Sequence, residues 1–271
     1  MTFSEIGAHP AVRGALDARG YSEPTPVQAA VLDPDLAGRD LLVSSRTGSG
    51  KTIAFGLLIA DAALGEGDRF PPAGPPIALV IAPTRELAVQ VQRELGWLFA
   101  EAGGRVASCV GGMDPRREAR ALSEGTHVVV GTPGRLRDHL ERRTLDLSAL
   151  RAVVLDEADE MLDMGFREEL EAILDATPPD RRTVLFSATL PKPIVELARR
   201  YTQEARRVAA TPPEQAHEDI EFRAHVVAPR EREHAIVNVL RDLEPASALV
   251  FRATREAVQH TAAGLSERGF E

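Results

Sequence analysis

The sequence predicts an α/β fold, a parallel β-sheet with helices on both faces. Apolar, β-branched runs alternate with helix-length amphipathic segments along most of the 271 residues. Most runs are continuous rather than alternating, which is typical of strands covered on both faces. Strand and helix in strict alternation predict βαβ units around a parallel sheet. Residues 41–52, LLVSSRTGSGKT, add a small-residue loop directly after the first run.

Six apolar runs are the expected strands, in chain order: DLLVSS (40–45), IALVIA (77–82), RVASCV (105–110), HVVVG (127–131), RAVVLDE (151–157) and RTVLFSA (182–188). Helical patterns separate them, among them 85–103, 115–125 and 191–201. Ligands of such sheets gather beyond the carboxyl ends of the strands. The residues that follow each run are therefore the candidate site.

A proline- and charge-rich segment, TPPEQAHEDI at 211–220, divides the chain. The alternation then resumes with two expected strands, IEFRAHVV and SALVFRAT, and two expected helices. Two strands are too few for a separate parallel-sheet domain. We therefore expect a first domain at 1–210, a linker at 211–219 and a partial second domain, truncated, at 220–271. The alternative is a helical and hairpin extension packed on the first domain.

Composition narrows the function classes. The formal net charge is −9 and the pI about 5.4, so an anionic partner must meet a local patch. A single cysteine, Cys109, cannot form an internal disulfide, and its apolar run predicts a core position. The sequence shows neither a membrane span nor a signal peptide, and we expect a cytoplasmic protein. We expect solvated helix faces to hold the arginine pairs that begin at 116, 142, 181, 199 and 206. The histidines, His127 and His139 among them, show no metal-ligand spacing.

Residues 45–52 match the phosphate-loop pattern G-x-x-x-x-G-K-[ST] except at the first position, which holds Ser45. Gly48 and Gly50 are the glycines that let backbone N–H groups approach phosphates. The basic residues number 32, and only Lys51 and Lys192 are lysines. A compact ammonium suits the outer phosphates better than a forked guanidinium, so we interpret Lys51 as a phosphate ligand.

Asp156 and Glu157 end the run RAVVLDE, at the predicted carboxyl edge of the sheet. A phosphate-loop enzyme needs an acidic residue there to hold Mg²⁺, together with the loop hydroxyl, here Thr52. The second carboxylate could polarise a water molecule for attack on the γ-phosphate. Carboxylates after a strand are usually solvated turn residues, and the joint occurrence with the phosphate loop favours the catalytic interpretation.

Seven segments in this order resemble those of the DEAD-box RNA helicases, ATP-dependent enzymes built of two RecA-like domains. They are GYSEPTPVQ (20–28), SRTGSGKT (45–52), PTRELA (83–88), GG (111–112), TPGR (132–135), DEAD (156–159) and SAT (187–189). The resemblance covers the chain nearly end to end and implies a RecA-like first domain and the start of a second. Since the family usually has alanine where this chain has Ser45, a small residue suffices and the phosphate cradle is expected to survive.

The resemblance also implies residue roles. Gln28 would bond the adenine edge, with Tyr21 and Phe3 stacking on the ring. The nucleotide-binding set is then Phe3, Tyr21, Gln28, Ser45, Thr47, Gly48, Ser49, Gly50, Lys51 and Thr52, the catalytic residues are Lys51, Asp156 and Glu157, and the metal ligands are Thr52 and Asp156. Sequence-independent contacts to the backbone of single-stranded or duplex RNA would come from Thr84, Arg85, Gly112, Thr132, Gly134 and Arg135. Ser187 and Thr189 would bond Asp159 and couple ATP hydrolysis to strand separation.

The implied function is an ATP-dependent RNA helicase core that uses ATP and Mg²⁺. The family's second domain supplies arginines that no segment here matches, and an arginine finger contributes about 10³ to 10⁵ in rate. This chain alone is therefore expected to be nearly inactive. Two alternatives stay open, an ATP-gated RNA clamp and an ATP-driven DNA translocase. The sequence does not indicate which RNA or which protein partners are bound.

Overall fold

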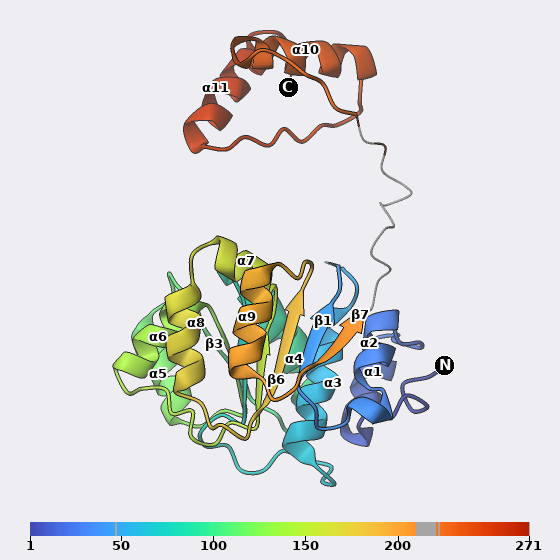
Figure 1. The fold of residues 1–271 in the computed structure, drawn as a ribbon, viewed down its shortest axis with the longest axis vertical. Helices are drawn as coiled ribbons and strands as arrows, with labels where there is room; N and C mark the ends of the chain where they lie inside the picture. Colours follow the sequence, from blue (N-terminus) through green and yellow to red (C-terminus); the bar gives the residue numbers. More distant parts are fainter. Residues whose placement is uncertain (47, 210–220, 222, 271) are drawn as a thin grey trace. The chain divides into compact units, whose positions relative to one another are not determined.

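The computed structural model describes residues 1–46, 48–209, 221 and 223–270. Its contacts divide the chain into two compact units, Met1–Pro213 and Glu214–Glu271, each described by itself (Figure 1). The predicted linker at 211–219 lies outside the described residues.

The first unit contains a seven-stranded sheet in the order β3-β4-β2-β5-β6-β1-β7. Every pair of neighbouring strands is parallel. The strands are β1 (Leu41–Ser44), β2 (Ala78–Ile81), β3 (Val106–Cys109), β4 (Val128–Gly131), β5 (Ala152–Leu155), β6 (Arg182–Ser187) and β7 (Arg206–Ala209). All six apolar runs form strands, and the predicted α/β class with a parallel sheet is confirmed.

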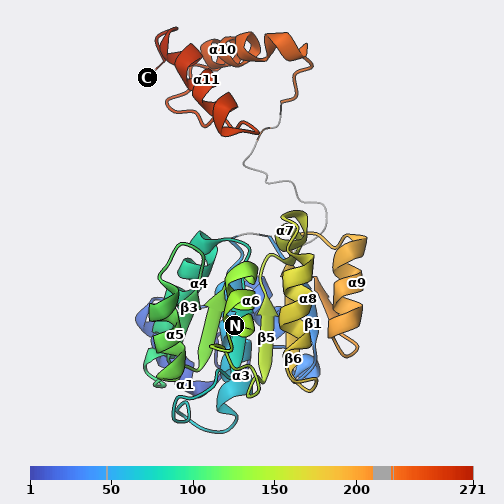
Figure 2. The same ribbon diagram turned by 90° about the vertical axis from the view of Figure 1, so that its left-hand side faces the viewer.

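Helices cover both faces of this sheet (Figures 1 and 2). One face packs against α1 (Pro10–Ala18), α2 (Pro26–Val31), α3 (Lys51–Leu64) and α4 (Arg85–Ala100). The other packs against α5 (Pro115–Ser123), α6 (Pro133–Glu141), α7 (Ala158–Asp163), α8 (Arg167–Asp175) and α9 (Lys192–Tyr201). A short 3₁₀ helix, η1 (Pro34–Leu36), lies on the first face. No helix in the described part of the chain is long and apolar enough to cross a membrane.

Successive residues of one strand serve two separate cores. Leu41 and Val43 belong to the apolar layer under α1 to α4, whereas Leu42 belongs to the layer under α5 to α9. Side chains alternate across a strand, so a strand buried on both faces needs apolar residues at consecutive positions. This is why the continuous runs of the sequence become the inner strands.

Strand β7 was missed by the sequence analysis. Its four residues, Arg-Arg-Val-Ala, contain one buried side chain, Val208. It forms the sheet edge beside β1, where one neighbour and one covered face are enough. Such a strand has no continuous apolar run. The expectation that Arg206 and Arg207 lie on a helix face was wrong, because both residues belong to this edge strand.

The second unit contains η2 (Pro229–Glu231), α10 (Arg232–Leu243) and α11 (Arg255–Ser266). The two predicted helices are confirmed. The two predicted strands, 220–227 and 247–254, are not, because their described residues form no β-ladder. Strands need neighbours to satisfy their backbone groups, and Val226, Leu249 and Phe251 remain exposed instead.

Candidate active site

The predicted phosphate loop lies between β1 and α3, at the carboxyl edge of the sheet. Gly48 and Gly50 have φ angles of 75° and 88°, in the left-handed region that glycine adopts without steric cost. Helix α3 begins at Lys51, so its unpaired N–H groups and positive dipole end face the loop. The arrangement suits an anion. Thr47, part of the predicted loop, lies outside the described residues.

Ser45 ties the start of this loop to the neighbouring strand. Its N–H donates to the carbonyl oxygen of Ser187 over 3.1 Å, which extends the β1–β6 pairing. The Ser45 side chain is 1% exposed, so only a small residue fits there. The hydroxyls of Ser45 and Ser49 are buried and have no hydrogen-bond partner among the residues that the structure describes. Buried polar groups are rarely left unpaired, and such groups mark a polar binding site.

Three charged side chains meet at this loop, as predicted. The Lys51 ammonium lies 3.5 Å from Oδ1 of Asp156 and 3.4 Å from Oε1 of Glu157. Asp156 is almost fully buried, and burial raises its pKa to about 6 although Lys51 acts in the opposite direction. Glu157 has a φ of 53°, a left-handed conformation that costs a non-glycine residue about 1 to 3 kcal/mol. Such strain is typical of functional sites.

The predicted adenine-binding residues are packed against the protein itself. The Gln28 carboxamide is buried, donates to Gly50 O over 3.1 Å and accepts from Thr25 N over 2.9 Å. Phe3 is 4% exposed in the core, and Tyr21 stacks on Trp97 with ring centroids 5.8 Å apart. Gln28 therefore links the start of α2 to the phosphate loop. The adenine-binding roles stay predictions.

Asp159 and Thr189 meet as predicted. Oδ2 of Asp159 accepts from Thr189 N over 2.9 Å and from Thr189 Oγ1 over 2.8 Å. Burial favours the neutral carboxyl, but the hydrogen bonds outweigh it and lower the Asp159 pKa. The Ser187 hydroxyl donates to the carbonyl oxygen of Thr189 over 2.6 Å, and Ser187 also contributes to the lowered pKa of Asp159. The expected Ser187–Asp159 bond stays a prediction. The segment after β6 is thus held against α7.

The structure brings the predicted RNA-contacting segments together at the ends of β2, β3 and β4. Arg85 Nη2 lies 3.2 Å from the sulfur of Met113, and both Nη atoms of Arg135 donate to Met113 O over 3.2 and 3.3 Å. Gly112, with a φ of 77°, lies so close to Arg85 that an added Cβ would be 2.6 Å from Nη1. Thr84 and Thr132 are the N-caps of α4 and α6, and Gly134 is exposed in the first turn of α6. Two arginines thus converge on one loop.

A buried polar network beneath this loop escaped the sequence analysis. Glu118 accepts hydrogen bonds from Val110 N (2.9 Å) and Arg135 Nη1 (2.7 Å), and its Oε2 lies 2.8 Å from His139 Nε2. Nδ1 of His139 is in turn 2.7 Å from the Thr144 hydroxyl. Glu118 and His139 are almost fully buried. A glutamate on a charged helix and a histidine after TPGR carry no local signal of burial.

Cys109 lies beside this network. Its sulfur, a Glu118 oxygen and a His139 nitrogen are all within 4.8 Å of one another, a spacing that could hold a metal ion. The donors do not favour one, because Glu118 and His139 are already hydrogen-bonded and burial raises the Cys109 pKa to about 12. The thiol is neutral and belongs to the core, as expected from its apolar strand.

Comparison with known proteins agrees with this geometry. A DEAD/DEAH box helicase family profile matches residues 25–197. The DEAD-box ATP-dependent RNA helicase CshA of Geobacillus kaustophilus is 40% identical over 270 residues, 99% of this chain and 56% of that protein. CshA of Bacillus subtilis is 37% identical over 271 residues, 100% of this chain and 53% of its own length. The chain spans about half the length of these curated relatives.

A solved structure resembles the chain over its whole length. It is a DEAD box protein from the hyperthermophile Methanococcus jannaschii, with a TM-score of 0.71 and 34% identity, and the match covers 100% of this chain and 71% of that one. The matched family profile covers the phosphate loop, the Asp156–Glu157 pair and the SAT segment that were described above. The chain belongs to the DEAD/DEAH box helicase family.

Proposed function

We propose that this chain is the ATP- and RNA-binding core of an ATP-dependent RNA helicase. The contact of Lys51 with both Asp156 and Glu157, at the mouth of a glycine-containing loop, carries the proposal. A phosphate-loop site needs this set: a cation for the phosphates, a carboxylate for a metal ion and a second carboxylate as base. The relatives reported above are ATP-dependent RNA helicases, which supports the same activity.

The residues present fit Mg²⁺. Oδ1 of Asp156 is buried and accepts no hydrogen bond from the described residues, its contact with the Lys51 ammonium at 3.5 Å being an ion pair. Thr52 offers a hydroxyl in the first turn of α3. Mg²⁺ prefers such oxygen ligands and is usually held by one or two protein side chains together with phosphates and water. When bound, the ion would neutralise charge on the phosphates. Lys51 would bind the outer phosphates, and Glu157 would accept a proton from the attacking water.

RNA would be bound by its backbone at the loop where Arg85 and Arg135 converge. Thr84, Gly112, Thr132 and Gly134 lie around it and offer hydroxyl and backbone N–H groups. Contacts of this kind ignore base identity, so binding would be independent of sequence. The Asp159–Thr189 hydrogen bonds connect α7, which follows the catalytic carboxylates, to the segment after β6, and would couple hydrolysis to strand separation.

We propose further that the chain by itself hydrolyses ATP slowly and does not unwind RNA. The family's arginine motif has no matching segment in this sequence, and the chain spans about half the length of its relatives. Losing an arginine finger lowers the rate by about 10³ to 10⁵.

Steady-state ATP hydrolysis and nucleotide binding, with and without single-stranded RNA, test both proposals. Lys51→Ala is the blank, and Lys192→Ala, the only other lysine and 89% exposed, is the matched control. We expect wild type and Lys192→Ala to bind ATP equally, Lys51→Ala to lose binding, and hydrolysis to stay near the blank. Absence of ATP binding would contradict the ATPase proposal. Strong stimulation by RNA would contradict only the proposal of low activity, and equal stimulation by single-stranded DNA would favour a translocase.

A further inference from the structure

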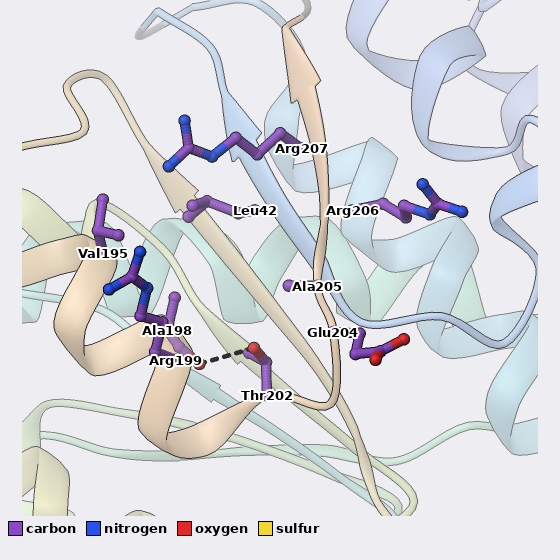
Figure 3. A pocket seen from close by; sticks show the side chains of 9 residues that line it. All are labelled: Leu42, Val195, Ala198, Arg199, Thr202, Glu204, Ala205, Arg206 and Arg207. Atoms are coloured by element: carbon purple, nitrogen blue, oxygen red, sulfur yellow. Dashed lines mark hydrogen bonds between the residues drawn. The ribbon is translucent and has the colours of Figure 1, made fainter.

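A groove on the first unit lies between α9 and the edge strand β7, with a volume of about 460 Å³ (Figure 3). Its lining comes from β1, α9, β7 and the turn between the last two. None of its residues belongs to the predicted ATP or RNA sites. The groove is therefore a separate surface feature.

Two arginines face this groove from opposite walls. Arg199 reaches it from α9 and Arg207 from β7, on the same side of β7 as Leu42, while Arg206 points to the other side of β7 (Figure 3). Glu204, the acidic residue of the lining, also points away in this view. Facing arginines thus concentrate positive charge in a chain whose net charge is −9.

These arginines have no partner within the described part of the chain. Arg199 and Arg207 are exposed and form no hydrogen bond or ion pair there. The neighbouring Arg200, by contrast, lies 2.8 Å from Glu171 and 3.7 Å from Asp175. Like charges that face each other repel, so the fold gains nothing from this placement.

The floor of the groove is apolar. Leu42 is 3% and Ala198 4% exposed, and Val195 and Ala205 are half-buried beside them. The Thr202 hydroxyl is turned to the protein, where it donates to Ala198 O over 2.6 Å. The floor thus accepts aliphatic side chains. The described lining contains no aromatic ring, so nucleobases would find nothing to stack on.

We propose that this groove binds an extended acidic segment of a partner protein. Carboxylates of the segment would pair with Arg199 and Arg207, whose planar guanidinium groups bind carboxylates with two parallel hydrogen bonds. An aliphatic side chain between them would cover Leu42 and Ala198. The exposed ion pairs make this a weak, salt-sensitive interaction, as is common for transient contacts.

Fluorescence anisotropy with a labelled peptide, Glu-Leu-Asp-Glu-Leu-Asp, tests this proposal directly. We expect Arg199→Ala/Arg207→Ala to lower the affinity about tenfold, which corresponds to about 1.4 kcal/mol for the loss of two exposed ion pairs. The matched control, Arg116→Ala/Arg120→Ala, removes the same charge from exposed positions of α5 and is expected to bind like wild type. The amide peptide, Gln-Leu-Asn-Gln-Leu-Asn, is expected to bind as weakly as the groove variant does with the acidic one.

Three results would overturn the proposal. They are equal binding of the acidic peptide by wild type and the groove variant, loss of single-stranded RNA binding in the groove variant alone, and self-association of the chain that the groove variant abolishes. The second result would assign the groove to a phosphate backbone, and the third to another copy of this chain. ATP binding should be unchanged in the groove variant. A failure of the acidic-peptide proposal is therefore distinguishable from a failure of the ATPase proposal.

Discussion

Removal of the Glu118 carboxylate is expected to weaken the first unit more than any exposed charge change. In the variant Glu118→Ala, Val110 N loses its acceptor and the Arg135 guanidinium, 13% exposed, loses its carboxylate. His139 loses the partner of Nε2 at the same time. Val110 and His139 are buried and the Arg135 side chain is 13% exposed, so none of these groups is freely solvated once the carboxylate is gone.

The magnitude follows from these contacts. Removal of one partner from a buried ion pair costs about 3 to 5 kcal/mol, because an uncompensated charge remains. Arg135 keeps its bonds to Met113 O, which places the expected loss in the free energy of unfolding at about 3 kcal/mol. Glu118→Gln keeps an acceptor in the same place without the charge, and a loss of about 1 to 2 kcal/mol is expected.

Urea unfolding followed by Trp97 fluorescence measures this difference, since Trp97 is the only tryptophan and lies in α4 of the first unit. The matched control is Glu124→Ala, which removes an exposed glutamate just beyond the same helix and is expected to change stability by less than about 0.5 kcal/mol. A loss in Glu118→Ala no larger than in this control would refute the argument that the network stabilises the loop.

Two further predictions concern the amino-terminal ends of strands β1 and β6 and the last residue of helix α9. Asp40→Ala should lower the free energy of unfolding of the first unit by about 2 to 3 kcal/mol in the same urea assay. The reason is that Thr183 N and Gln203 N, each 2.6 Å from the Asp40 carboxylate, lose their acceptor. A change below about 0.5 kcal/mol would contradict this. Burial and a 3.0 Å hydrogen bond to Asp175 raise the pKa of Tyr201 to about 12. In a spectrophotometric titration Tyr201 should therefore ionise only near pH 12. The variant Asp175→Ala should lower the Tyr201 pKa.

Local patterns in the sequence predicted most of the fold and the centre of the site. Consecutive apolar residues such as Leu41 to Val43 indicate a strand buried on both faces, whatever the strand order. The spacing of Gly50, Lys51 and Thr52 indicates a phosphate loop because its geometry depends on neighbouring backbone atoms. Once all strands run parallel, Lys51 and Asp156 must reach the same edge of the sheet.

The tertiary structure alone decided features that depend on distant partners. Strand β7 exists because β1 offers a free edge. The burial of Glu118 and His139 follows from hydrogen bonds that join α5 to the end of β3 and to α6. The absence of strands from the second unit's described residues follows from their lack of neighbours. The groove between Arg199 and Arg207 arises only when α9 and β7 meet on opposite sides of Leu42. The sequence by itself determined the inner strands and most helices of the first unit and the end of the sheet that holds the charged site, because these depend on contacts between neighbours in the chain. Only folding decided which polar side chains are buried together, because that depends on contacts between residues far apart.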